Sequence, residues 1–245
     1  MDLRETVVVT TVSVNIETDD FAAAAALGER FIDEFEATEL EICRATPESG
    51  RTGYTLSVGY RTPPADGEEP VDTLRRAALP ALFHFGLNAE FFEIHGTPRT
   101  GLHGSYVAAD EQADGCTLYS LLAAVGGTDP REPTYVPRYD FTPRAATDVI
   151  SRVHLYVPTD DLRAAVRLCG GPVSDLATSL VRITTAAGPC EAVLLSAFPA
   201  IAGESGEEAL SRVTEEVNGH LSHVNMSVRA VHTGLEDDPF HTEPG

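Results

Sequence analysis

Apolar and polar side chains alternate in two stretches that lie far apart in the chain, residues 11–26 and 152–167. Such alternation predicts a β-strand with one buried face. In each stretch the strand is followed by Thr-Asp-Asp and an alanine-rich amphipathic run. This predicts a helix start, because side-chain oxygens cap free amides and acidic groups favour the positive end of the helix dipole. The alternating apolar residues are Val12, Val14 and Ile16 in the first stretch and Val153, Leu155 and Val157 in the second. Together the two stretches indicate an internal repeat.

The residues after each start predict the same order of elements, strand-helix-strand-strand-helix-strand. After the opening strand, the first copy is predicted to contain the helix 19–36, the strands 40–45 and 54–60, the helix 71–85 and the strand 88–95. The second copy is predicted to contain the strand 149–157, the helix 160–169, the strands 180–186 and 191–198, the helix 206–217 and the strand 221–232. This is the order of the ferredoxin-like plait. We therefore expect an α+β fold of two tandem ferredoxin-like (β-α-β-β-α-β) units packed as one pseudo-symmetric body.

The repeat divides the chain into four segments. Residues 1–96 and 149–233 are the two predicted units. Residues 97–148 are predicted to connect them, although this segment contains the apolar run Leu118–Val125. Residues 234–245 are acidic and contain two prolines, so we expect a disordered tail.

Charge narrows the range of partners. The 245 residues include 38 acidic and 17 basic side chains, for a net charge of −21, and every basic one is arginine. Such an acidic surface repels phosphate backbones, so we expect no nucleic-acid partner. No stretch approaches the length of a membrane span, and the N-terminus lacks a signal-peptide pattern. We therefore expect a cytoplasmic protein without a membrane partner.

The absence of lysine excludes several kinds of chemistry. A Schiff-base enzyme, a P-loop and a kinase built on a strand lysine all need that residue. No G-x-G-x-x-G or G-x-S-x-G occurs, and the four cysteines are widely spaced, as expected of buried free thiols. We expect no cofactor and no metal. One alternative stays open, a metal site that the fold would assemble from Glu93, His95, His154 and His223. Separately, residues 152–162 resemble the start of a vicinal-oxygen-chelate module, in which the histidine of the strand binds a metal.

The predicted strand 88–95 carries the first candidate chemistry. Alternation places Glu93 and His95 on one face beside Phe91, and Glu90 on the other face. A carboxylate in apolar surroundings has a raised pKa, which suits a general acid or base. Solvent exposure of the same face is the competing interpretation. The neighbouring residues that could position a substrate are Arg76, His84, Arg99, His103 and Tyr106.

The predicted strand 221–232 carries the second candidate site. Its polar face would hold His223, Asn225, Ser227 and Arg229. His154 lies on a strand of the same unit and shares a face with Arg152 and Tyr156. These residue types suggest a surface that binds a small-molecule substrate, and a solvated face is the alternative.

The tandem α/β units and the Glu-His strand are similar to those of the actinobacterial Pictet–Spengler enzymes, which form β-carbolines from tryptophan and an aldehyde. The resemblance implies that Glu93 is the acid/base, that His84 or His95 is its partner, and that Arg76 or Arg99 anchors a carboxylate. On this basis we expect a cofactor-independent cyclase, condensing enzyme or lyase of bacterial specialised metabolism, such as antibiotic biosynthesis. A non-catalytic, small-ligand-binding or regulatory plait protein, which could form a homodimer, is the alternative. A protein–protein adaptor without a ligand is the third.

Overall fold

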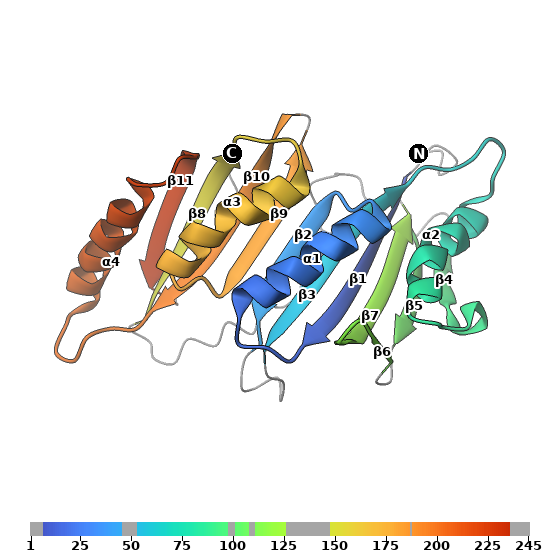
Figure 1. Cartoon of the computed structure of the whole chain (residues 1–245), viewed down its shortest axis with the longest axis horizontal. Coiled ribbons are helices and arrows are strands. Elements are labelled where there is room, and N and C mark those ends of the chain that lie inside the picture. Colours follow the sequence, from blue (N-terminus) through green and yellow to red (C-terminus); the bar gives the residue numbers. More distant parts are fainter. Residues whose placement is uncertain are drawn as a thin grey trace. The chain divides into compact units, whose positions relative to one another are not determined.

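The computed structural model describes residues 7–45, 53–97, 101–107, 111–125, 148–186 and 188–235. They form a mixed α+β structure with antiparallel strand pairing and four α-helices (Figure 1). The chain divides into two compact units, Met1–Tyr139 (unit 1) and Asp140–Gly245 (unit 2). None of the helices within the described ranges is long and apolar enough to cross a membrane.

Unit 1 is a sheet with two α-helices on one face. Its neighbouring strands follow the order β2-β3-β1-β7-β5-β4, and the short strand β6 pairs with β7. In chain order its elements are β1 (Val8–Ile16), α1 (Phe21–Phe35), β2 (Glu39–Arg44), β3 (Tyr54–Thr62), α2 (Pro70–His84), the 3-10 helix η3 (Ala89–Phe91), β4 (Glu93–Thr97), β5 (Gly101–Val107), β6 (Gln112–Ala113) and β7 (Cys116–Val125).

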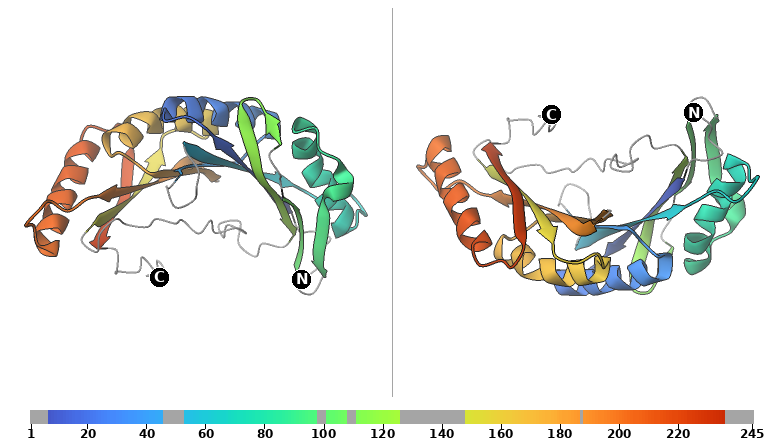
Figure 2. Two further views of the ribbon diagram at one scale, coloured as in Figure 1. Left: turned by 90° about the horizontal axis from the view of Figure 1, so that it is seen from below. Right: turned by 90° about the horizontal axis from the view of Figure 1, so that it is seen from above.

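Unit 2 has the predicted element order of strand, helix, two strands, helix and strand, with the strands arranged as β11-β8-β10-β9. Its elements are β8 (Val149–Val157), α3 (Leu162–Asp175), β9 (Leu180–Ala186), β10 (Gly188–Phe198), α4 (Gly206–Leu221) and β11 (Ser227–Leu235). Both α3 and α4 lie on the same face of this sheet (Figure 2). We call the face of each sheet opposite its helices the back face.

The two Thr-Asp-Asp triplets form the predicted helix starts. Asp20 is the N-cap of α1 and accepts a hydrogen bond from the Ala22 amide at 2.9 Å. Asp161 caps α3 in the same way and accepts from the Arg163 amide at 2.9 Å. Because a cap satisfies amides that have no partner inside the helix, both helices begin where the sequence places them.

Strand register is also repeated between the units. In unit 1, Val58 on β3 stands opposite Val12 on β1 and Leu40 on β2. In unit 2, Leu194 on β10 stands opposite Val153 and Val181. All of these side chains are buried, so the alternating apolar residues form the helix-facing core of each sheet.

A second repeated signature precedes the later helix of each unit, P-x-x-x-G-E followed eight residues after the Glu by Arg. In unit 1 the Arg76 guanidinium donates to Glu68 at 2.9 Å and 2.7 Å and to the Pro63 carbonyl at 2.7 Å. This network, which we call the arginine clamp, joins the loop before the helix to the helix itself. The corresponding residues of unit 2 are Pro199, Glu204 and Arg212.

The structure corrects the prediction of a strand over 88–95. Asn88 caps η3 by accepting a hydrogen bond from the Glu90 amide at 3.0 Å, so the chain turns here, as is typical of an Asn side chain that bonds its own backbone. Strand β4 begins only at Glu93. Phe92 packs its ring directly on Gly104, where a Cβ would collide with it. Phe91 therefore does not share a strand face with Glu93.

The predicted connecting segment 97–148 also differs from the structure, because it contains strands of the unit 1 sheet. Strand β7, which includes the apolar run Leu118–Val125, pairs directly with β1, whereas β4 is separated from β1 by β5 and β7. Leu118 and Leu121 are buried. The apolar alternation of β7 thus belongs to a strand of the unit 1 sheet that pairs with β1, and not to a connector.

In unit 2 the predicted strand 221–232 begins later than expected. Helix α4 continues to Leu221, because Val213, Val217 and Leu221 are buried at helical spacing. Strand β11 begins at Ser227 and runs to Leu235, so its last residues replace the start of the predicted tail.

Candidate functional site

Alternation on β8 creates a polar surface on the back face of unit 2. Ser151, Val153, Leu155 and Val157 are buried on the helix side, whereas the residues between them are half-buried or exposed. Neighbouring strands extend this surface across the sheet. We call the resulting set the Arg152 cluster: Arg152, His154 and Tyr156 on β8, Glu191 on β10, and Arg229 and His232 on β11.

Register brings these side chains together from three strands. Glu191 stands opposite Tyr156, and His232 stands opposite Arg152. Val228 pairs with Leu155 and Ala230 with His154, which leaves Arg229 as the extra residue of a β-bulge.

The bulge directs Arg229 onto the back face, since a bulge re-aims side chains that regular pairing would place elsewhere. Its guanidinium carbon lies 5.6 Å from the centre of the Tyr156 ring, and its Nη1 lies 3.4 Å from Glu191 Oε2. The Arg229 side chain is 53% exposed and that of Glu191 is 40% exposed. An ion pair of this length and exposure contributes little stability.

His154 is half-buried among cations. Burial lowers its pKa to about 4, and the nearby positive charges of Arg152, His232 and Arg229 contribute in the same direction. The His154 and His232 rings meet edge to face with their centres 5.9 Å apart. His154 is therefore neutral at pH 7 and offers one N–H donor and one acceptor nitrogen.

Arg152 carries a buried donor with no matching acceptor. Its Nε atom is buried and has no hydrogen-bond partner within the described ranges. Leaving such a group unpaired costs about 1–3 kcal/mol, and more when the group is charged. An acceptor oxygen at this point would remove that cost, so the arrangement is suited to binding a polar ligand.

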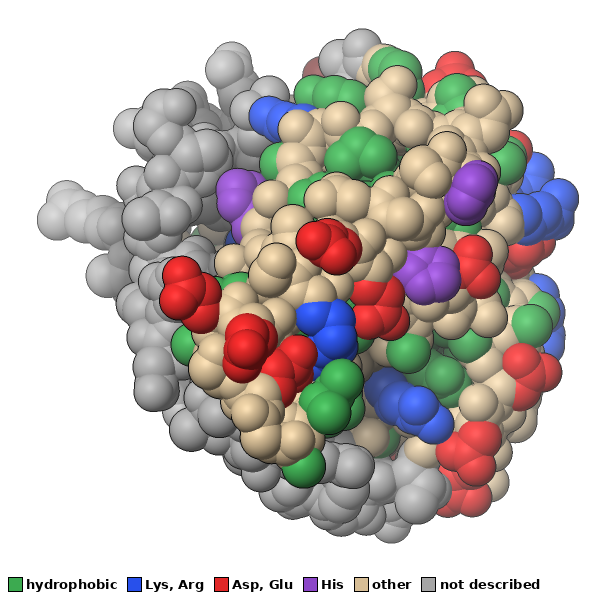
Figure 3. Space-filling view, turned by 90° about the vertical axis from the view of Figure 1, so that its left-hand side faces the viewer, with side chains coloured by type: hydrophobic (Ala, Val, Ile, Leu, Met, Phe, Trp, Pro, Cys, Tyr) green, Lys and Arg blue, Asp and Glu red, His purple; other side chains and the backbone are tan. Residues whose placement is uncertain are grey.

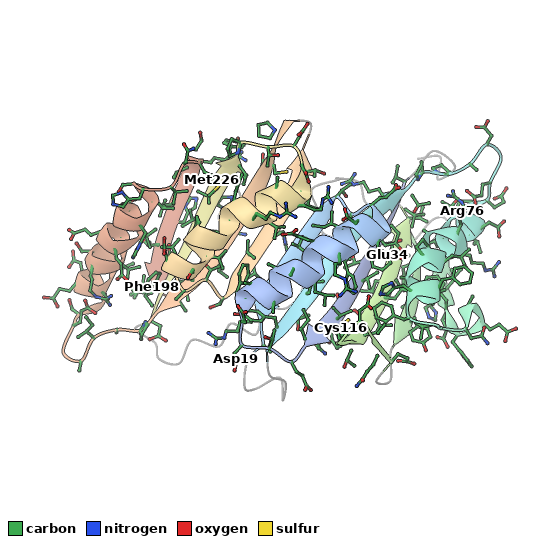
Figure 4. The ribbon with its side chains drawn as sticks, in the orientation of Figure 1. Asp19, Glu34, Arg76, Cys116, Phe198 and Met226 are labelled. Carbon is green, nitrogen blue, oxygen red and sulfur yellow. The ribbon has the colours of Figure 1, made fainter. Side chains whose placement is uncertain are left out.

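The other second-unit candidates lie outside this cluster. His223 and Asn225 precede β11 and are exposed, and Met226 lies at the same end of the strand (Figure 4). Of the four residues predicted for this strand face, Ser227 and Arg229 belong to β11. Glu191 and His232 were missed, because the sequence does not reveal which residues face each other across strands.

Glu93, His95 and His103 lie together on the hairpin of β4 and β5. His95 stands opposite His103, with ring centres 5.6 Å apart, and Nε2 of His95 lies 3.3 Å from Oε2 of Glu93. The Glu93 side chain is 73% exposed and that of His95 is 51% exposed. The predicted neighbours Glu93 and His95 do meet, but in solvent and not beside Phe91 in an apolar environment.

His84 is separate from that hairpin pair. It ends α2 and is packed edge-on among Phe31, Phe35 and Phe85. Its Nε2 lies 3.5 Å from Oδ2 of Asp114. The surroundings are those of a packed histidine at a helix end.

The remaining unit 1 candidates also have structural surroundings. Arg76 forms the arginine clamp at the start of α2 (Figure 4). Tyr106 points to the face opposite His103 because of strand alternation. Its hydroxyl donates to Glu111 at 2.8 Å, a hydrogen bond that raises the pKa of Tyr106. Arg99 lies outside the described residues.

The thiols do not form a reactive site. Burial raises the pKa of both Cys43 and Cys169 to about 12 and that of Cys116 to about 11, so these residues are protonated thiols at pH 7 and poor nucleophiles. Among the residues that the structure describes, no three His, Cys, Asp or Glu side chains are arranged to hold a metal ion.

Comparisons with known proteins give no family for this chain. No protein-family model matches it. No curated protein matches its sequence. One solved structure it resembles is described as aspartate kinase from Synechocystis, with 9% identity over 94% of this chain and a TM-score of 0.23. The match spans 44% of that kinase chain, and likeness this low carries no argument about fold or function.

Proposed function

We propose that the protein binds a small polar organic ligand on the back face of unit 2, at the Arg152 cluster. The observation that carries the proposal is the buried Nε of Arg152, which has no hydrogen-bond partner among the residues that the structure describes. A sheet face that only has to be solvated does not need a buried guanidinium beside a half-buried, neutral histidine. Donors from Arg152, His154 and Arg229, with the ring of Tyr156, offer a ligand both hydrogen bonds and a flat contact surface.

We also propose that both units are ferredoxin-like plaits. The order β11-β8-β10-β9 of unit 2 supports this, as does the corresponding order β7-β1-β3-β2 within unit 1. In this interpretation the hairpin of β4 and β5 is an insertion before the last strand of the first plait. Such plaits host many activities, so the proposed function depends on the cluster and not on the fold.

The test is a thermal-shift screen of the full chain against small metabolites of varied charge, with neutral compounds included. A ligand present at 100 times its dissociation constant stabilises the folded state by about 2.7 kcal/mol. The shift should disappear in Arg152→Met and persist in Arg75→Gln, because Arg75 is an exposed residue of α2 in unit 1. Ligand shifts that survive in a folded Arg152→Met protein would place the site elsewhere.

Proton transfer on the β4–β5 hairpin is a second candidate function. It is favoured by the 3.3 Å approach of Glu93 and His95 opposite His103. In this interpretation Glu93 and His95 move a proton in a condensation or cyclisation like that of the Pictet–Spengler family. With tryptophan and an aldehyde as substrates, Glu93→Gln should lower the rate of β-carboline formation about 10²–10⁴-fold.

The matched control for that experiment is Glu90→Gln, which changes a carboxylate of η3 that lies outside β4. Turnover should stay near the wild-type value in this control. If both variants turn over at the wild-type rate, the hairpin does no proton transfer and ligand binding stands alone.

A further inference from the structure

The Arg152 cluster is a cationic island in an acidic protein. The chain carries a net charge of −21, and acidic side chains are spread over the surface beside α4 and β11 (Figure 3). Three arginines nevertheless lie on the back face of unit 2. Strand register places Arg152 opposite His232 and puts Arg182 in line with His154 through Val193. Arg229 has no cross-strand partner, but the bulge directs its side chain onto this face, beside Tyr156 and Glu191. Among the described strand residues of this face, Glu191 is the one carboxylate. This local excess of positive charge attracts negatively charged solutes.

Glu191, the one carboxylate among the described strand residues of this face, pairs with Arg229 and not with Arg152. Glu191 Oε2 lies 3.4 Å from Arg229 Nη1, whereas Arg152 Nε has no acceptor among the described residues. Charge-assisted hydrogen bonds from a guanidinium to an anionic oxygen are about twice as strong as neutral ones. An anion is therefore the acceptor that satisfies Arg152 best.

The ion pair of Glu191 and Arg229 is weak enough for an anionic ligand group to take the place of the Glu191 carboxylate. It is a single long contact between half-exposed side chains, so losing it costs little. An anionic group that replaces Glu191 at Arg229 would still leave that guanidinium over the Tyr156 ring, where it lies now.

We propose that the ligand of the Arg152 cluster is an organic anion, a carboxylate or a phosphate, that docks on Arg152 and Arg229 and displaces Glu191 from Arg229. The inference rests on the proposed function and names the class of its ligand. Glu191 is a specificity-determining residue in this scheme, because it competes with weak anions and repels those that cannot replace it.

The pKa of His154 provides a second, independent way to detect a bound anion, because charged groups surround this side chain. Arg152 lies on β8, the same strand as His154. Arg229 and His232 lie on β11, Glu191 on β10 and Arg182 on β9. Burial is the main cause of the low pKa of His154, and the positive charges of Arg152, His232 and Arg229 lower this pKa further. An anion placed between Arg152 and Arg229 adds a nearby negative charge, which raises the pKa of His154 and makes binding take up protons in weakly acidic buffer.

The experiment is isothermal titration of the full chain with inorganic phosphate in one arm and succinate in the other, at constant ionic strength in chloride. At least one anion should bind saturably to one site, and the arm that saturates identifies the source of the charge. Affinity should fall at least tenfold in Arg229→Gln and in Arg152→Met, rise a few-fold in Glu191→Gln, and stay unchanged in Arg75→Gln.

Arg229→Gln keeps the test decisive if Arg152→Met fails to fold, because Arg229 is largely exposed.

Histidine NMR at a saturating anion concentration provides the second measurement. The His154 resonance is assigned by its loss in His154→Asn. It should titrate at a higher pH with the anion bound than in the free protein. Equal affinities in wild type, Arg229→Gln and Glu191→Gln would overturn the inference, and so would the absence of saturable binding in both arms. If the screen finds a neutral compound that depends on Arg152 while neither anion binds, the anion inference fails and the proposed function stands.

Discussion

The back faces of the two units place different chemistry on matching positions of the repeat. The matching residues are Thr11, Ser13 and Asn15 on β1 and Arg152, His154 and Tyr156 on β8. In unit 1 the polar groups satisfy one another: Ser13 Oγ lies 2.8 Å from Ser57 Oγ, and Thr55 Oγ1 donates to Asn15 Oδ1 at 3.0 Å. In unit 2 a buried donor of Arg152 has no partner within the described ranges. Strands of matching register thus carry polar groups that bond one another in one unit and a face suited to a ligand in the other.

The last strands show the same contrast. Strand β7 pairs Ser120 with Ser13 and Leu118 with Val14, so Tyr119 is an extra residue opposite β1. Arg229 is the extra residue at the corresponding place opposite β8. Bulges tend to be kept as designed features. Here a shared irregularity places a phenol in one unit and a cation in the other, which shows that the backbone alone does not decide the chemistry.

The largest expected effect tests whether the two cores are equivalent. Ile42 and Ile183 occupy matching positions and are each 1% exposed. Replacing either by Ala removes buried methyl groups and leaves a cavity, so Ile42→Ala and Ile183→Ala should each lower the free energy of unfolding by about 2–5 kcal/mol in urea titrations. The controls Ile42→Val and Ile183→Val should cost only about 0.5–1.5 kcal/mol. A near-zero cost at one position would mean that the two cores are packed differently.

A smaller effect should distinguish His154 from its counterpart Ser13. The folded-state pKa of His154 is about 4, below its ordinary value of 6.5, so the unfolded chain binds more protons between these pH values. Stability should therefore rise with pH from about 4 to 6.5. In thermal melts His154→Asn should flatten this part of the profile, and Ser13→Ala should leave its shape unchanged. A profile that keeps its slope in His154→Asn would contradict the assigned pKa.

The smallest effects should come from the two arginine clamps. Hydrogen bonds from Arg76 and Arg212 lower the pKa of Glu68 and Glu204 to about 2. A carboxylate with a depressed folded-state pKa stabilises the fold above its ordinary pKa of 4.5 and loses that contribution as the pH falls toward 2. Arg76→Gln and Arg212→Gln should lower the midpoint of thermal unfolding slightly and to similar extents at pH 7, and the difference from wild type should shrink below pH 4. Unequal shifts at pH 7 would indicate that the clamps are not equivalent.

Local signals predicted much of each unit. Asp20 and Asp161 cap helices as their sequence pattern indicates, because capping depends only on residues a few positions apart. The apolar alternation around Val12 and Val153 identified the buried faces for the same reason. Glu93 and His95 meet as expected, since residues two apart on a strand share a face.

Non-local pairing accounts for what sequence reasoning missed. The apolar run that ends at Val125 read as part of a connector because nothing near it in the chain shows that its partner is β1. The hydrogen bonds of Arg76 to Glu68 and Pro63 were not predicted, because they form only when the loop folds back on the helix. Glu191 on β10 contacts Arg229 on β11, although the two residues are 38 positions apart in the chain.

The sequence by itself determined the helix starts, the alternating strand faces, the repeated element order of unit 2 and the acidity of the protein. These features depend on local backbone geometry, capping and composition, which act over a few residues. The tertiary structure decided which strand lies beside β1, where the bulges fall and which side chains form the Arg152 cluster. Such features depend on cross-strand register between distant residues, and register is set by packing and hydrogen bonding in three dimensions.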